Sequence, residues 1–175
     1  RGSADMVVRN GSEVVTGDVN IGNSNAVAGS TASLLITGAG TTWDAEGTVS
    51  MGNNASITIA DGAQLSGWGM GLNDADISGA GTSVTGNSSY LNGDSSITDG
   101  ATFSMTGELN VSRDSNIIID GAGTTASGSR SYAYDELQVS NGASLDLSGK
   151  LVLSDFYNAT SGMSITGGST VTVGE

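Results

Sequence analysis

The sequence predicts an all-β chain folded as a right-handed parallel β-helix with three short strands per rung and about seven or eight rungs, a rung being one turn of the chain about the helix axis. Three observations predict it. Turns that end in glycine return at nearly even spacing. Between them, short stretches alternate apolar and polar residues with the period of a strand. No stretch shows the 3.6-residue period of a helix, in a chain that contains 28 Gly.

The turn glycines define the repeat. Successive glycines lie 27, 24, 17, 21, 21, 21 and 25 residues apart, so one rung contains about 22 residues. Two kinds of turn alternate without exception: in one the last aliphatic residue stands three positions before the glycine, as in "VRNG" and "IADG", and in the other two positions before it, as in "ITGAGT". Two rungs therefore form a larger repeat of about 42 residues. The glycines are Gly11, Gly38, Gly62, Gly79, Gly100, Gly121, Gly142 and Gly167.

Each unit contains three alternating stretches. The first follows the glycine, as at Trp43 and Leu65, and the second comes next, as at Val49 and Met70. The third precedes the next turn. A unit this small cannot bury its own apolar face, so it must stack on its neighbours, with equivalent strands about 4.8 Å apart. The third stretches should then form one continuous apolar column of Ile36, Ile59, Ile77, Ile97, Ile119 and Val139.

Two other architectures compete with this prediction. A left-handed β-helix needs strict six-residue steps, whereas the spacing here varies, which favours the right-handed form with loops at its corners. A β-sandwich of many short strands stays open, but it does not explain why two kinds of turn alternate.

Composition excludes several kinds of function. The chain carries 5 Lys and Arg against 18 Asp and Glu, a net charge of −13, so nucleic acid and anionic membrane surfaces are not expected partners. It contains no Cys and no His, which removes thiolate chemistry and the usual zinc ligands. No run of 18 apolar residues is present, and the calcium-binding nonapeptide of some solenoids is missing. We expect no cofactor and no metal.

The first residues differ from the rest. "RGS" looks like the remnant of an expression tag, so residues 1–5 are expected to be tag or linker and residues 6–175 a segment of a longer β-helix.

The string "GAGTTWDAEGTVSMGNNASITIADGAQL", residues 38–65, resembles the passenger repeats of bacterial autotransporters, and the same scheme repeats from about residue 6 to residue 173. Trp43 fits the family pattern, whereas Val84 and Ala126 replace the tryptophan in later copies. The resemblance implies export through the outer membrane of a Gram-negative bacterium and display at the cell surface or release as a secreted protein. It also implies a C-terminal membrane barrel outside this segment.

The expected function is adhesion and not catalysis. "NGDSSIT", residues 92–98, is similar to the serine site of protease passengers but lacks the second glycine, and the chain has no His to act as base for Ser95. We expect an adhesin or self-association scaffold, of the kind tied to biofilm and virulence, that acts through polar strand ladders and loops. Its partner would be a second copy, side by side or end to end, or a host-cell surface protein or glycan. A released effector that binds a host receptor and a polysaccharide-active β-helix enzyme stay open as alternatives.

Candidate binding residues are aromatic and basic. Phe156 and Tyr157 fall in an inserted stretch that should be an exposed loop, and Arg130, Tyr132 and Tyr134 are further candidates for an exposed loop. Tyr132 and Tyr134 stand where the second strand is expected, displaced by two residues from its usual apolar positions. They could therefore also fill the core or stack on a neighbouring rung. Five N-glycosylation sequons are present, at Asn10, Asn54, Asn87, Asn110 and Asn158.

Overall fold

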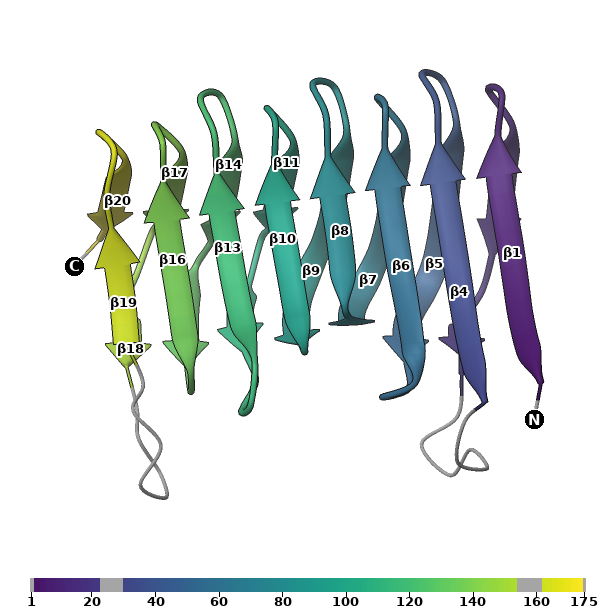
Figure 1. The fold of residues 1–175 in the computed structure, drawn as a ribbon, viewed down its shortest axis with the longest axis horizontal. Helices are drawn as coiled ribbons and strands as arrows, with labels where there is room; N and C mark the ends of the chain where they lie inside the picture. The colour runs from purple at the N-terminus through teal and green to yellow at the C-terminus, as the bar shows by residue number, and fades with distance from the viewer. Residues whose placement is uncertain (1, 23–29, 154–161, 175) are drawn as a thin grey trace.

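The chain forms strands and turns. The computed structural model describes residues 2–22, 30–153 and 162–174, and within these ranges it contains 20 strands and no helix. None of the described segments could therefore cross a membrane as a helix. Figure 1 shows the strands stacked side by side along the long axis of the molecule, with the N-terminus at one end and the C-terminus at the other.

One strand from each rung builds an eight-stranded parallel sheet, which faces the viewer in Figure 1. These are the predicted third strands, and the register is the predicted one. Val8, Ile36, Ile59, Ile77, Ile97, Ile119, Val139 and Ile165 follow one another as direct partners. The single apolar column is therefore confirmed, and with it the stacking of rungs. The strands are β1 (Ser3–Arg9), β4 (Thr31–Thr37), β6 (Ala55–Ala60), β8 (Ala75–Ser78), β10 (Asp94–Thr98), β13 (Asn116–Asp120), β16 (Glu136–Ser140) and β19 (Gly162–Ile165).

The first and second strands of each rung join into one bent sheet of 12 strands. In most rungs they are separate: β2 (Glu13–Thr16), β3 (Val19–Ile21), β11 (Thr102–Met105), β12 (Glu108–Val111), β14 (Thr125–Gly128), β15 (Arg130–Ala133), β17 (Ser144–Leu147), β18 (Leu151–Leu153) and β20 (Thr170–Val173). In three rungs they run on as single ten-residue strands, β5 (Thr42–Met51), β7 (Gln64–Asn73) and β9 (Ser83–Asn92), where the sequence predicted two.

Glycine at the bend allows β7 and β9 to turn the corner as continuous strands. Gly67 and Gly86 are direct partners in the middle of β7 and β9, and a Cβ on Gly86 would lie 2.8 Å from the carbonyl oxygen of Gly67. Without a side chain the backbone turns sharply and still makes its ladder bonds. In β5 the register shifts between Ala45 and Thr48, which is the irregularity expected of a β-bulge at a corner.

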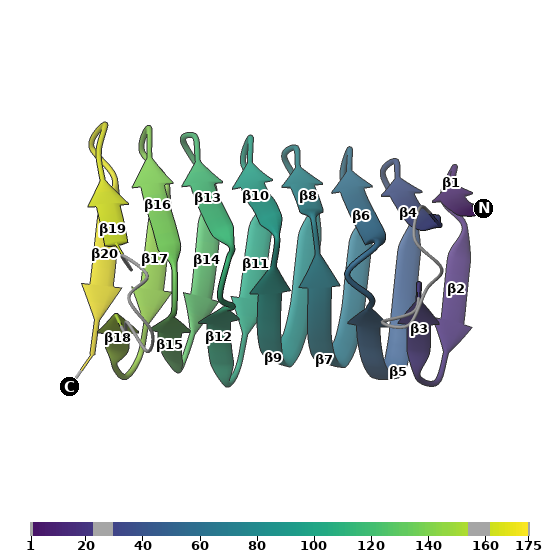
Figure 2. The same ribbon diagram turned by 60° about the horizontal axis from the view of Figure 1, so that its bottom comes forward.

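The helix is right-handed. In Figure 1 the strands of the eight-stranded sheet run upward in front, and the chain then passes over the top and runs downward behind. Successive rungs advance from the N-terminus on the right to the C-terminus on the left, which is the right-handed sense that the sequence predicted. Figure 2 shows the bent sheet from below, with β12, β15 and β18 on the underside.

The alternating turns are joined in pairs by buried threonines. The hydroxyl of Thr82 accepts a hydrogen bond from the backbone N–H of Gly62, one rung earlier, at 2.9 Å and donates to the carbonyl of Ser78 at 2.8 Å. Thr41 and Thr124 make the same two contacts at their own turns. Each "GAGT" turn thus reaches back to the Asn-Gly or Asp-Gly turn before it, which is the physical basis of the two-rung repeat.

Candidate functional site

The outer surface of the first strands carries two rows of side chains, polar at every position except Val15, which we call the hydroxyl face. In rung order the first row is Glu13, Thr42, Gln64, Ser83, Thr102, Thr125, Ser144 and Thr170, and the second is Val15, Asp44, Ser66, Thr85, Ser104, Ser127, Asp146 and Thr172. The residues that lie between these positions along each strand, such as Leu65 and Phe103, point inward to the core, because successive strand residues point to opposite faces.

Neighbouring rungs hold the side chains of the hydroxyl face in line. Ser127 Oγ donates to Ser104 Oγ at 3.0 Å, and Ser66 Oγ donates to Asp44 Oδ1 at 2.8 Å. The middle of the face is uncharged, since its residues over three rungs are all Ser or Thr: Ser83, Thr85, Thr102, Ser104, Thr125 and Ser127. The result is a surface of hydroxyl groups that can each donate and accept.

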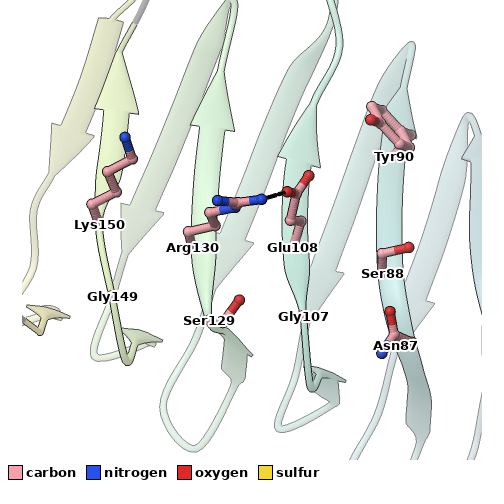
Figure 3. Close-up of a pocket in the computed structure, with 9 residues that line it drawn as sticks. All are labelled: Asn87, Ser88, Tyr90, Gly107, Glu108, Ser129, Arg130, Gly149 and Lys150. Carbon is pink, nitrogen blue, oxygen red and sulfur yellow. Dashed lines mark hydrogen bonds and ion pairs between the residues drawn. The ribbon is translucent and has the colours of Figure 1, made fainter.

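A second feature is a groove along the corner between first and second strands, which we call the corner groove. Its volume is about 720 Å³, and its lining comes from successive rungs: Asn87, Ser88, Tyr90, Gly107, Glu108, Ser129, Arg130, Gly149 and Lys150. Figure 3 shows the longer side chains in one row and the two glycines in another.

The floor of the groove is low because two of its four corner positions, which are Asn87, Gly107, Ser129 and Gly149 in rung order, carry no side chain. A Cβ on Gly107 would lie 2.7 Å from the carbonyl oxygen of Asn87, and one on Gly149 would lie 2.6 Å from that of Ser129. The backbones of adjacent rungs are closely packed here, with Gly107 N–H donating to Asn87 O at 2.6 Å. A side chain at either glycine would both fill the groove and push the rungs apart.

The wall of the groove contains an ion pair between adjacent rungs. Arg130 on β15 donates from Nε to Glu108 Oε1 on β12 at 2.7 Å, and its Nη2 contacts the same oxygen, as drawn in Figure 3. Hydrogen bonds from Asn110 and Arg130 lower the pKa of the Glu108 carboxyl, and the carboxylate in turn raises the pKa of the Arg130 guanidinium. Both groups are therefore charged at neutral pH.

Asn110 holds the Glu108 carboxylate of this ion pair in place. Its Nδ2 donates to Glu108 Oε2 at 2.9 Å, and its Oδ1 accepts from the backbone N–H of Tyr132 at 3.2 Å. It is only 2% exposed, since it lies between the larger side chains of Tyr90 and Tyr132 in the same outward row. A buried amide with both ends bonded holds the carboxylate in one orientation.

The three candidates predicted around residue 132 are brought together, although on a strand and its end and not on a loop. Arg130 and Tyr132 lie on β15, and Tyr134 follows it. Ser131 and Ala133 take the inward positions, so the displacement seen in the sequence turns both tyrosines outward. Their rings stack with centroids 6.3 Å apart, and the cations of Arg130 and Lys150 lie 5.7 Å and 5.9 Å from the Tyr132 centroid.

Other predicted site residues are scattered. Phe156, Tyr157 and Asn158 lie outside the described residues. Of the other four sequons, Asn10 lies in an exposed turn and Asn54 donates to the Ser30 carbonyl at 2.7 Å. The remaining two lie at the corner groove: Asn87 is exposed and lines it, and Asn110 is buried against its wall residue Glu108.

The site includes residues that the sequence analysis did not select. Trp68, Tyr90, Glu108 and Lys150 line the groove or the hollow that continues it towards β5. A usable signal was present for Tyr90, because period-two alternation around the buried Leu91 places it at an outward position. No such signal was present for Trp68, because it stands two residues before the buried Met70 and strict alternation would turn it inward; the alternation is interrupted between these two residues.

No catalytic arrangement forms around Ser95. Its side chain is buried, and its hydroxyl accepts from Ala75 N–H at 3.0 Å and donates to the Asn92 carbonyl at 3.0 Å. Among the described residues no three acidic side chains lie close enough to hold a metal ion. Comparisons with protein-family models, with curated proteins and with solved structures found no match to this chain.

Proposed function

We propose that this segment is part of a surface-exposed or secreted autotransporter passenger and acts as an adhesin that associates with copies of itself through the hydroxyl face. The observation that carries the proposal is the pair of outward rows that continues over eight strands, polar at every position except Val15 and without an aromatic side chain.

The chemistry of the face suits pairing with an identical face. A hydroxyl is both donor and acceptor, so Thr102, Ser104 and Thr125 can bond to the same residues of a second molecule. Each bond contributes only about 1 kcal/mol in water, but the stacked rungs repeat it at about 4.8 Å along a rigid rod. Many rods on one cell multiply the contact, so weak pairing of molecules becomes firm attachment of cells.

Location and membrane attachment rest on the resemblance of the repeats to passenger repeats. Export through the outer membrane would place the rod at the cell surface, held by a barrel that lies outside these residues. We expect no catalytic step in this segment.

The test is expression of the segment on the surface of a bacterium that does not clump. The unaltered chain should make cultures settle. Thr102→Asp with Thr125→Asp places like charges opposite each other in a face-to-face pair and should abolish settling. Ser56→Asp with Ser164→Asp adds the same charge at outward positions of the eight-stranded sheet and should leave settling intact.

Two outcomes would count against the proposal. If the Thr102 and Thr125 variant settles as fast as the unaltered chain, the hydroxyl face is not the contact. If the segment binds host cells but never causes settling, it is a receptor ligand and not a self-associating adhesin.

A further inference from the structure

The exposed apolar side chains single out one surface. Among the residues that the structure describes, eight large hydrophobic residues are exposed, and six of them lie on edge strands at the two ends of the stack, where one side of the strand has no neighbour: Met6, Val7, Val15, Leu153, Ile165 and Val173. The other two, Trp68 at 65% and Tyr90 at 52% exposure, lie on β7 and β9, which are strands of middle rungs. Exposed aromatic residues with no such structural reason mark a contact surface.

These two residues continue the corner groove. Tyr90 and Ser88 line both the corner groove and a hollow beside it that Trp68 completes. Apart from Trp43 and Phe103, which are in the core, every aromatic residue that the structure describes lies along the corner groove and the hollow beside it. Tyr90 and Tyr132 stand two rungs apart in one outward row, a separation of about 10 Å.

Two positively charged side chains also line the corner groove. Arg130 and Lys150 are two of the 5 Lys and Arg in a chain of net charge −13. Glu108 balances Arg130, and Lys150 forms no ion pair with any residue that the structure describes. The groove lining therefore carries one net positive charge, which is available to an anionic group.

We propose that the corner groove, together with Trp68 and Tyr132 beside it, binds an oligosaccharide that carries carboxylate groups, extended along the axis of the β-helix. Trp68 and Tyr90, the two exposed aromatic residues, supply flat apolar surfaces for the C–H faces of sugar rings, and the half-buried Tyr132 ring holds the cations of Arg130 and Lys150 beside them. Asn87, Ser88 and Ser129 supply polar groups for the sugar hydroxyls, and Lys150 pairs with a carboxylate. This site is separate from the hydroxyl face, so the proposal does not depend on self-association.

Other ligands fit the groove less well. Single-stranded nucleic acid also stacks on aromatic residues, but it needs many cations along its phosphates, and this chain is strongly acidic. A peptide that adds as a strand needs an unpaired sheet edge, whereas β9, β12 and β15, which carry most of the groove, pair on both sides. Sugars need neither, because their hydroxyls bond to side chains and their rings lie flat.

Tryptophan fluorescence provides the assay. Trp43 is buried and Trp68 is exposed, so a ligand in the groove should change the emission of Trp68 alone. Titrants are a panel of carboxylated hexasaccharides (oligogalacturonate, oligoguluronate and hyaluronan fragments), a neutral hexasaccharide of glucose, and hexaglutamate as an anionic peptide. We expect saturable binding of at least one carboxylated sugar, weaker binding of the neutral sugar and no binding of the peptide.

Variants locate the site. Tyr90→Ala and Tyr132→Ala should each weaken binding about tenfold, and Lys150→Gln should weaken it and reduce its salt dependence. Arg9→Gln removes the same charge outside the groove and should change nothing. Far-ultraviolet circular dichroism and thermal melts show whether each variant is folded, and Tyr132→Phe, which keeps the ring, should retain binding.

Three results would overturn the proposal: no carboxylated sugar in the panel binds, hexaglutamate binds as tightly as the sugars, or the groove variants bind like the unaltered protein. Equal binding of neutral and carboxylated sugars would show that Lys150 does not pair with a carboxylate, and would contradict the proposal that the ligand is a carboxylated sugar. None of these results depends on whether cells expressing the segment settle.

Discussion

Ile118 and Ile119 are adjacent on β13 and provide a direct test of the stacked core. Ile119 is buried between Ile97 and Val139 of the neighbouring rungs, whereas Ile118 points outward and is half-buried. Ile119→Ala deletes three carbons, which at about 0.8 kcal/mol each costs about 2.4 kcal/mol in lost burial. The rungs on either side are fixed by ladder hydrogen bonds and cannot close the gap, so a cavity term raises the cost to about 3–4 kcal/mol.

The assay is equilibrium unfolding in urea. With a slope of about 2–3 kcal/mol per molar urea, Ile119→Ala should lower the midpoint by more than about 1 M. Ile118→Ala makes the same deletion one residue away and should cost about 1 kcal/mol or less, because it removes mainly β-propensity and partial burial. Equal losses in the two variants would refute the assignment of faces, and the stacked column with it.

Two further variants test the turns and the ion pair. Thr82→Val keeps the shape but leaves Gly62 N–H without its acceptor, so it should destabilise by about 1–3 kcal/mol, whereas Thr82→Ser should lose much less; equal urea midpoints would contradict the role of the hydroxyl. The folded chain lowers the pKa of Glu108 below 4.5, so the stability that Glu108 adds is present above about pH 4.5 and is lost as the pH falls through the lowered value. Urea midpoints of the unaltered protein and Glu108→Gln should accordingly converge in acid, and a gap that widens in acid would contradict this sign.

The architecture could be predicted because its determinants are local and repeated. Alternation with period two fixes which residues face inward, and the spacing of turns fixes which residues stack, so the column through Ile97 and Ile119 follows from the sequence. The continuity of β5, β7 and β9 could not be predicted in the same way. It depends on whether a glycine bend such as Gly86 keeps its ladder bonds, and that is decided by the adjacent rung.

The candidate site was harder to predict because it is made between rungs. Arg130 and Tyr132 stood out by residue type, but Glu108 and Lys150 belong to the site only because the register places their strands on either side of β15. Two displaced tyrosines could face the core or the solvent, and the small inward residues Ser131 and Ala133 decide between these. The groove itself arises from side chains that are missing at Gly107, which a search for functional residue types overlooks.

The threonine contacts that join the turns in pairs make the protein modular in steps of two. Removing one rung would set two turns of the same kind next to each other. A hydroxyl such as that of Thr82 would then lose the backbone N–H from which it accepts a hydrogen bond. Removing or inserting two rungs leaves every junction as before. Gene duplication and protein engineering alike should therefore lengthen this rod by even numbers.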